Sequence, residues 1–248
     1  MTRAALLLPL LALIGCPAGE AGTPQDFVVT RQYPHDVEAY TQGLLWQDGV
    51  LYESTGRYAH SELRRVDLAT GRVLQRQALP NDRFGEGLAL LDGVLYQLTW
   101  ESGVAYSWDA RTFAPRDSFT YVGEGWGLAT DGRKLWMSDG SDSLRVLDPR
   151  TFRAERIVHV RLDGQPVVRI NELEWVDGVL LANVYETDRI VRIDPATGAV
   201  TRVYDFSALY PDRPPEVDVL NGISRAPVPG ELLVTGKYWP TVYQVKLR

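Results

Sequence analysis

The sequence predicts an all-β protein, a five-bladed β-propeller in which an N-terminal strand closes the last blade. Three observations carry this prediction: a short signature that recurs five times, an Asp-Gly turn after most of its copies, and an N-terminal strand that has no repeat of its own. The copies lie 40 to 50 residues apart, a period typical of propeller blades and solenoid repeats. Four copies pair glycine with an aliphatic residue, and one has glutamate instead. The aligned positions are Gly43, Gly87, Gly127, Glu172 and Gly222.

Each repeat contains the same succession of predicted strands. The signature opens the first strand, and an Asp-Gly pair then separates it from a second apolar strand, which is the strongest short-range signal for a β-hairpin. A third strand alternates and ends in aspartate, and a fourth follows a turn such as 69–71. Four antiparallel strands form one propeller blade. The Asp-Gly pairs are Asp48-Gly49, Asp92-Gly93, Asp131-Gly132 and Asp177-Gly178.

The last repeat supplies only three strands, at 222–224, 231–235 and 241–245. Residues 27–33 read as a further strand that precedes the first repeat. We expect this strand to become the outer strand of the fifth blade, because that pairing closes the ring and covers an exposed sheet edge. The segment 204–219, which contains three prolines, is predicted as a long loop, and such loops in compact domains are often functional.

Residues 1–16 have the features of an export signal. Arg3 precedes an apolar run that is too short to span a membrane as a mature helix. The run ends in Leu-Ile-Gly-Cys, which resembles a bacterial lipobox, so Cys16 is the expected lipidation site; the alternative is a plain signal peptide with an incidental cysteine. We expect an exported, periplasmic lipoprotein that meets the membrane only through its lipid anchor. A linker at 17–25 and the propeller domain at 26–248 follow.

Composition and charge disfavour several functional classes. Charged residues make up 23% and hydrophobic residues 45% of the 248 residues, as in ordinary soluble domains. A net charge of −6 without a basic cluster argues against nucleic-acid binding. The three histidines lack metal-ligand spacing, Cys16 is the only cysteine, and there is no nucleotide-binding glycine loop, so we expect that no cofactor is required. A structural ion in the central channel remains open, since carbonyls and carboxylates bind hard cations.

Antiparallel pairing brings the start of each first strand and the end of each second strand to one face of a propeller. Polar and aromatic residues from all five blades therefore meet at one mouth. A carboxylate, an ammonium, carboxamides and aromatic rings together suit a small polar ligand with an apolar stem. The residues that the topology places there are Gln42, Glu86, Trp100, Trp126, Asn171, Tyr185, Asn221 and Lys237.

Seven motifs, in order along nearly the whole of 27–248, resemble those of the plant-latex and bacterial type of glutaminyl-peptide cyclotransferase (glutamine cyclotransferase). The resemblance implies a five-bladed propeller that converts N-terminal glutamine of peptides and proteins to pyroglutamate and releases ammonia without a catalytic metal. The motifs are Tyr40-Thr41-Gln42-Gly43-Leu44, Phe84-Gly85-Glu86-Gly87-Leu88, Leu98-Thr99-Trp100, Glu124-Gly125-Trp126-Gly127-Leu128, Asn171-Glu172-Leu173-Glu174-Trp175, Ala182-Asn183-Val184-Tyr185-Glu186-Thr187-Asp188 and Thr235-Gly236-Lys237-Tyr238-Trp239-Pro240.

The resemblance also implies roles for individual residues. Glu86 would be the general acid/base, and Asn171 and Lys237 would bind and polarise the side-chain amide of the substrate. One departure concerns Tyr185, which stands where the family usually has tryptophan, so affinity or substrate range is expected to differ. The residues that would shape the pocket are Gln42, Phe84, Trp100, Trp126 and Tyr185.

These residue types suit the chemistry on its own terms. The nucleophile is the α-amine of the substrate itself, so the protein mainly holds a ring-closing conformation, and one carboxylate can take the amine proton and deliver it to the leaving nitrogen. Two alternatives remain: a non-catalytic binding propeller, and a carbohydrate-binding or carbohydrate-processing propeller with Glu124, Glu172 and Asp139 as candidate paired carboxylates. The combination of Glu86 with an amide and a lysine at one mouth favours the cyclase.

Overall fold

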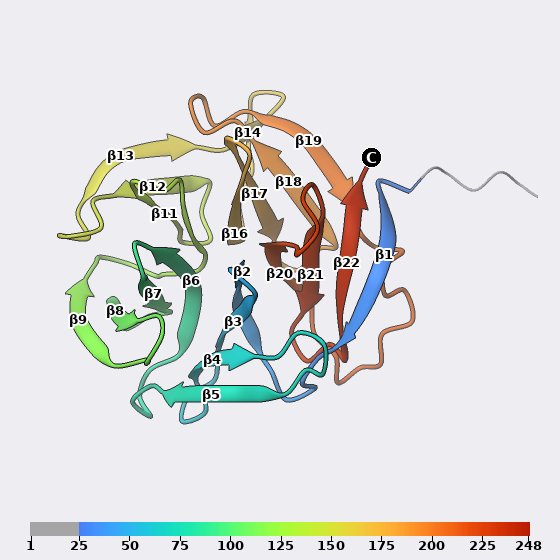
Figure 1. Ribbon diagram of the computed structural model, residues 1–248. Helices are drawn as coiled ribbons and strands as arrows, with labels where there is room; N and C mark the ends of the chain where they lie inside the picture. Colours follow the sequence, from blue (N-terminus) through green and yellow to red (C-terminus); the bar gives the residue numbers. More distant parts are fainter. Residues whose placement is uncertain (1–24) are drawn as a thin grey trace, which may run out of the picture.

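The computed structural model describes residues 25–248. The predicted signal peptide at 1–16, its lipidation site Cys16 and all but the last residue of the predicted linker at 17–25 lie outside the described residues. Figure 1 shows five sheets arranged as blades in a ring, coloured in sequence order around it. Within residues 25–248 there is no helix, and hence none long and apolar enough to cross a membrane.

Every blade is a four-stranded antiparallel sheet, as the repeat pattern predicts. Blade one contains β2 (Thr41–Gln47), β3 (Val50–Thr55), β4 (Glu62–Val66) and β5 (Val73–Ala78), and blade two contains β6 (Gly85–Leu91), β7 (Val94–Thr99), β8 (Val104–Asp109) and β9 (Pro115–Thr120). Blade three contains β10 (Leu128–Thr130), β11 (Leu135–Ser138), β12 (Ser143–Leu147) and β13 (Ala154–His159), and blade four contains β16 (Ile170–Val176), β17 (Val179–Val184), β18 (Arg189–Ile193) and β19 (Val200–Asp205).

The fifth blade is built from both ends of the described chain. It contains β20 (Leu220–Arg225), β21 (Leu232–Gly236), β22 (Thr241–Leu247) and, as the outermost strand, β1 (Phe27–Pro34). The register of β1 with β22 runs from Phe27 opposite Leu247 to Pro34 opposite Thr241. The predicted closure of the ring by the N-terminal strand is therefore confirmed, and β22 is not an edge strand (Figure 1).

The predicted Asp-Gly pairs lie at the turns between the first two strands of blades one to four. Asp48 (φ 51°) and Gly49 (φ 84°) both have positive φ, as a two-residue type I′ turn requires, and the pairs of blades two and four match them. Blade three differs: only Gly132 has positive φ, because the turn is longer and Asp131 N donates to Lys134 O. One further Asp-Gly hairpin was not predicted: Asp163-Gly164 joins β14 (Arg161–Leu162) to β15 (Gln165–Pro166) between blades three and four.

The innermost strands pack against one another around the axis, and this close packing explains the recurrent glycines. A Cβ on Gly43 would lie only 2.7 Å from the backbone nitrogen of Leu88 in the next blade. At the glycine position of blade four Glu172 reaches across instead: its carboxylate accepts hydrogen bonds from Leu44 N (3.3 Å) and Ile223 N (2.8 Å). Glu172 thus bonds to neighbouring backbone and links blade four to blades one and five.

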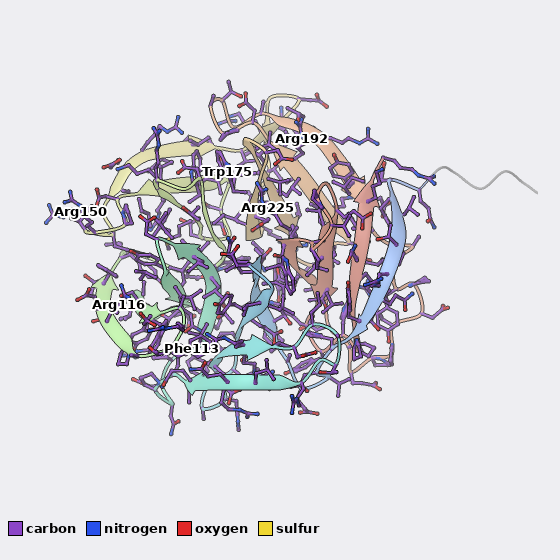
Figure 2. The ribbon with its side chains drawn as sticks, in the orientation of Figure 1. Phe113, Arg116, Arg150, Trp175, Arg192 and Arg225 are labelled. Carbon is purple, nitrogen blue, oxygen red and sulfur yellow. The ribbon has the colours of Figure 1, made fainter. Side chains whose placement is uncertain are left out.

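Hydrophobic residues fill the spaces between neighbouring blades rather than one central core. One cluster, for example, joins Leu181 and Ile190 of blade four to Leu220 and Val234 of blade five, and all four are almost fully buried. Figure 2 shows that charged side chains such as Arg150 lie at the outer edge of the ring. Apolar burial therefore holds each blade to the next, and it leaves the polar ends of the inner strands to form a site.

Candidate active site

Irregular register at the start of the inner strands directs the polar side chains toward the axis. In blades one, two, four and five the pairing of the first two strands skips residues at this end, as at Gly85 to Leu88 and at Ile170 to Leu173. Bulges of this kind disrupt the ladder locally and re-aim a side chain. Gln42, Glu86 and Asn171 all lie within such interruptions, so residues from three blades converge on the mouth.

A cavity of about 190 Å³ opens at this mouth. Of the nine residues that the topology or the resemblance places at the mouth, all but Asn221 line this cavity, and the structure adds Tyr40. The only sequence signal for Tyr40 is its position directly before the Thr-Gln-Gly that opens the first inner strand. Asn221 lies behind the lining, where its Nδ2 donates to Gln42 Oε1 (3.2 Å). The lining residues are Tyr40, Gln42, Phe84, Glu86, Trp100, Trp126, Asn171, Tyr185 and Lys237.

Glu86 is the one carboxyl group that lines this cavity. Only 4% of Glu86 is exposed, and its Oε1 accepts a hydrogen bond from Gln42 Nε2 (2.8 Å). Burial raises the pKa of Glu86 well above its usual range; Lys237 opposes this shift, and the negative charge of Glu124 adds to it. With its pKa raised in this way, Glu86 is suited to hold and to release a proton, as a general acid/base must.

Lys237 is the buried cation of the site, only 2% exposed. Its Nζ lies 4.6 Å from the centre of the Tyr40 ring and 4.9 Å from that of the Tyr185 ring, so two aromatic faces take the place of much of its hydration. Burial lowers the pKa of Lys237, while Glu86 and Asp218 act to raise it. Lysine is seldom buried without a partner or a task, and here it faces the cavity beside Glu86.

Asn171 is 2% exposed, and its Oδ1 is buried without a hydrogen-bond partner among residues 25–248. A buried acceptor without a partner costs about 1–3 kcal/mol. Because Asn171 also lines the cavity, an N–H group of a ligand that enters the cavity could satisfy this oxygen. The side chain is thus left with capacity to bind a polar substrate.

Aromatic rings form the walls. Phe84 meets Trp100 edge to face at 5.7 Å between ring centres, and Trp126 meets Tyr185 in the same way at 5.4 Å. The walls are apolar and the polar groups are few and converge, a combination typical of small-molecule sites.

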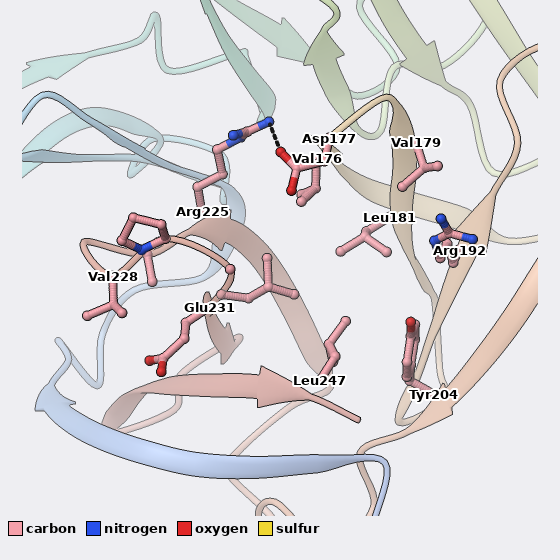
Figure 3. Close-up of a pocket in the computed structure, with 14 residues that line it drawn as sticks. Val176, Asp177, Val179, Leu181, Arg192, Tyr204, Arg225, Val228, Glu231 and Leu247 are labelled. Atoms are coloured by element: carbon pink, nitrogen blue, oxygen red, sulfur yellow. Dashed lines mark ion pairs between the residues drawn. The ribbon is translucent and has the colours of Figure 1, made fainter.

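A second cavity, of about 440 Å³, lies between blades four and five beside the turn at Asp177-Gly178, at the opposite end of the inner strands (Figure 3). Its polar groups include a solvent-exposed ion pair of Arg225 with Asp177 (3.4 Å). It offers no buried carboxyl or amino group, so although it is larger, we take the 190 Å³ cavity as the site.

The carboxylates that could have formed a glycosidase pair lie elsewhere. Glu172 is used by backbone N–H groups, and Asp139 pairs with Arg145 at 2.7 Å. Glu124 lies behind the tryptophans and does not line the cavity. Within the part of the chain described, no three His, Cys, Asp or Glu side chains are grouped so that they could hold a metal ion. Glu86 therefore has no second carboxylate opposite it, and a paired-carboxylate hydrolase is not favoured.

Fold and site together define a five-bladed propeller whose aromatic pocket contains one buried carboxyl group and one buried lysine. The chain belongs to the glutamine cyclotransferase family, whose sequence model matches residues 4–247. It is 40% identical over 229 residues to a glutaminyl-peptide cyclotransferase of Arabidopsis thaliana. The aligned residues cover 90% of this chain and 72% of that protein.

Solved structures agree with this membership. Glutaminyl cyclase from Myxococcus xanthus is 40% identical and superposes with a TM-score of 0.83, over 89% of this chain and 96% of that one. Hydrazine synthase from Kuenenia stuttgartiensis is 15% identical with a TM-score of 0.50, over 81% of this chain and 56% of that one, and this likeness concerns the fold alone. The suspected family and the five-bladed fold are both confirmed.

Proposed function

We propose that this protein cyclises the N-terminal glutamine of peptides and proteins to pyroglutamate with release of ammonia, and that Glu86 is its general acid/base. The observation that carries the proposal is the single buried carboxyl group of Glu86 facing an aromatic cavity beside Lys237 and Asn171. Membership of the glutamine cyclotransferase family supports the reaction, and the geometry supports the roles. A purely structural propeller would have no reason to bury this set of groups.

Binding selects the ring-closing conformation. The aliphatic stem of glutamine packs between the rings, and its amide meets the polar groups of the cavity: Asn171 and Lys237. Nucleophile and electrophile belong to one residue, the N-terminal glutamine, so fixing its torsions supplies much of the acceleration. Gln42, Phe84, Trp100, Trp126 and Tyr185 are proposed to shape the pocket.

The proton moves through Glu86. The α-amine nitrogen attacks the δ-carbon of the substrate's carboxamide, a new N–C bond forms, and the carbonyl oxygen takes up the electron pair. Glu86 accepts the amine proton and then returns it to the amide nitrogen as the C–N bond breaks, so that ammonia leaves and the carboxylate is restored. No covalent bond to the protein forms, no water is consumed, and the reaction as written needs no cofactor.

Lys237 and Asn171 stabilise the oxygen that becomes negative. Each preorganised donor to such an oxygen typically lowers the activation free energy by about 3 kcal/mol. The ammonium of Lys237 is suited to this because, with an exposure of only 2%, its charge is little screened by water. A structural ion in the central channel remains a separate prediction, with no role in these steps.

We also propose that the chain is exported and held at the periplasmic face of a membrane by lipid on Cys16. The support is the apolar run at 4–14 that ends in Leu-Ile-Gly-Cys. Fractionation of cells that express the full chain would place the wild-type protein with membranes. Cys16→Ser would release it to the soluble periplasm if it is still processed, and a wild-type protein found in the cytoplasm would contradict the proposal.

Mass spectrometry of a short Gln-initiated peptide tests the reaction. The domain at 26–248, incubated with the peptide and a chelator, is expected to accelerate the loss of one ammonia over the enzyme-free control. A peptide that begins with asparagine is the matched substrate control, since its shorter side chain would have to close a four-membered ring. No acceleration by a well-folded sample would refute the proposed function.

A further inference from the structure

Glu124 links the two tryptophans of the pocket from behind. Its Oε2 accepts one hydrogen bond from Trp100 Nε1 at 2.7 Å and another from Trp126 Nε1 at 2.8 Å. Trp100 directly follows β7 of blade two, and Trp126 lies just before β10 of blade three. One oxygen atom therefore ties together two rings that line the cavity and that belong to different blades.

The backbone around Glu124 is fixed to both blades. Gly125 N donates to Trp100 O (3.0 Å), and Trp126 N donates to Ser138 O (3.0 Å). A Cβ at Gly125 would lie 2.9 Å from Thr99 O and would also collide with the Tyr121 hydroxyl, so the chain passes here without room for a side chain. The carboxylate of Glu124 is consequently presented to the indoles from a rigid segment.

The two indoles are the inner members of a longer aromatic wall. Trp100 packs against Phe84 at 5.7 Å, and Trp126 packs against Tyr185 at 5.4 Å. Within residues 25–248 the two tryptophan rings are not in contact with each other, so it is the carboxylate of Glu124 that connects the two indoles. Loss of the carboxylate would leave two partly buried N–H donors without this acceptor and would remove the direct link between the two rings.

We propose that Glu124 is a positioning residue, whose carboxylate sets the spacing of Trp100 and Trp126 and so fixes the width of the pocket for a glutamine side chain. This inference rests on the proposed function of the same pocket. The charge of Glu124 has a second consequence, because it helps to raise the pKa of Glu86. The effect of Glu124 on the spacing of the tryptophans and the effect of its charge can be separated, because one substitution can alter the spacing and keep the charge while another removes the charge.

Three variants separate the two effects. Glu124→Asp keeps the negative charge but is too short to reach both indoles, so KM for a Gln-initiated peptide should rise about tenfold, the equivalent of roughly one charge-assisted hydrogen bond. Glu124→Gln keeps an acceptor but loses the charge, so KM should rise less. In Glu124→Gln the fall of kcat/KM on the acid side of the pH profile should move to lower pH, because Glu86 then ionises more readily. Glu124→Ala should show both effects.

Glu101→Gln is the matched control, because Glu101 is another glutamate near the mouth but bonds to the Tyr58 hydroxyl (3.3 Å) and not to an indole. It should leave KM unchanged. Acrylamide quenching of tryptophan fluorescence provides a readout without turnover, and it should increase in Glu124→Ala and Glu124→Asp. A wild-type KM together with unchanged quenching in Glu124→Ala would overturn the inference. If the wild-type protein proves inactive but quenching still increases in Glu124→Ala, only the proposed function is refuted.

Discussion

The side-chain amide of Gln42 donates a hydrogen bond from Nε2 to Oε1 of Glu86 across 2.8 Å. The orientation of this amide is set from its other end, where Gln42 Oε1 accepts from Asn221 Nδ2 at 3.2 Å. Blades one, two and five thus contribute one residue each to a chain that ends on the proposed acid/base. Because one oxygen of Glu86 is held in this way, the other is left to exchange the proton with the substrate.

Glu86→Gln should abolish cyclisation without unfolding the protein. Glutamine has nearly the same shape, and its amide oxygen can still accept the hydrogen bond from Gln42, but it can neither take nor return the proton. Loss of a general acid/base costs typically 10²–10⁴-fold in rate, so kcat should fall about that far. Ammonia release and thermal unfolding would be measured on the variant and on Glu101→Gln. Wild-type kcat in Glu86→Gln would remove Glu86 from the mechanism.

Activity should depend on pH through Glu86, whose pKa is influenced by the charge of the buried Lys237. The base must be ionised, so kcat/KM is lost as the pH falls through the raised pKa of Glu86, which lies above the ordinary value of 4.5. Lys237 lowers the pKa of Glu86, so Lys237→Met should move this acid limb to higher pH besides reducing kcat. Lys237→Arg keeps the charge and should leave the limb near its wild-type position. A limb that moves to lower pH in Lys237→Met would contradict the assigned electrostatics.

Much of the site could be predicted because the repeat fixes which strand ends share a face. Glu86 and Lys237 come from different blades, and the antiparallel order alone places both at the mouth. Tyr40 was not predicted to line the pocket, because the position of its side chain depends on the course of the loop that precedes β2. In this loop Ala39 O accepts a hydrogen bond from Tyr238 N (2.8 Å). The hairpin at Asp163-Gly164 was missed because it falls between repeats.

Contacts between blades were harder to predict than the blades themselves. The hydrogen bonds of Glu124 to two indoles, and of Glu172 to the backbone of two blades, depend on the distances between neighbouring sheets. Those distances are set by apolar packing in three dimensions, and a pattern of strands and turns along one chain does not contain them.

Glu172→Gln should destabilise the fold although it removes a buried acid. Both oxygens of Glu172 accept from backbone N–H groups, and the glutamine side chain would direct an NH₂ group at one of these donors. An unsatisfied buried donor costs about 1–3 kcal/mol, so the free energy of unfolding should fall by about 2 kcal/mol. Urea denaturation at fixed pH would measure this. If Glu172→Gln were as stable as the wild-type protein or more stable, burial of the carboxyl group would cost at least as much free energy as its two hydrogen bonds contribute.

The buried pair of His35 and Glu53 should make stability depend on pH. His35 Nδ1 donates to Trp239 O (2.7 Å) and Nε2 donates to Glu53 Oε1 (2.9 Å), so the ring is protonated. Burial alone would lower the pKa of His35 and raise that of Glu53. For His35, the attraction of Glu53 and the hydrogen bonds to Glu53 and Trp239 outweigh burial, so its pKa is raised. For Glu53, the attraction of His35 and of Arg64 outweighs burial, so its pKa is lowered.

The stabilisation by His35 is present below its ordinary pKa of 6.5 and is lost as the pH rises through the raised folded value. That by Glu53 is present above its ordinary pKa of 4.5 and is lost as the pH falls through the lowered folded value. Removing one partner of a buried pair costs about 3–5 kcal/mol. Glu53→Gln should therefore lower the free energy of unfolding most between these two ordinary values, whereas Glu155→Gln, in an exposed pair with Lys134, should change it little. A pH-independent difference would refute the charged pair.

Tyr185 should act through its ring and not through its hydroxyl. The ring packs on Trp126 and lies 4.9 Å from Lys237 Nζ, whereas the hydroxyl makes no hydrogen bond with residues 25–248. Tyr185→Phe should accordingly keep wild-type KM and kcat. Tyr185→Ala should raise KM about thirtyfold, because it removes both an aromatic contact and a cation–π contact of roughly 1 kcal/mol each.

Tyr185→Trp tests the same point from the opposite direction. Indole gives the strongest cation–π contact of the aromatic side chains, and its larger face extends the wall beside Trp126. KM for a Gln-initiated peptide should therefore fall several-fold, with kcat little changed, since the ring binds the side-chain stem equally before and during ring closure. If Tyr185→Phe instead lowered kcat at unchanged KM, the hydroxyl would be a hydrogen-bond donor to the reacting group. The tyrosine that replaces the family's usual tryptophan would then affect catalysis and not the binding of the substrate side chain.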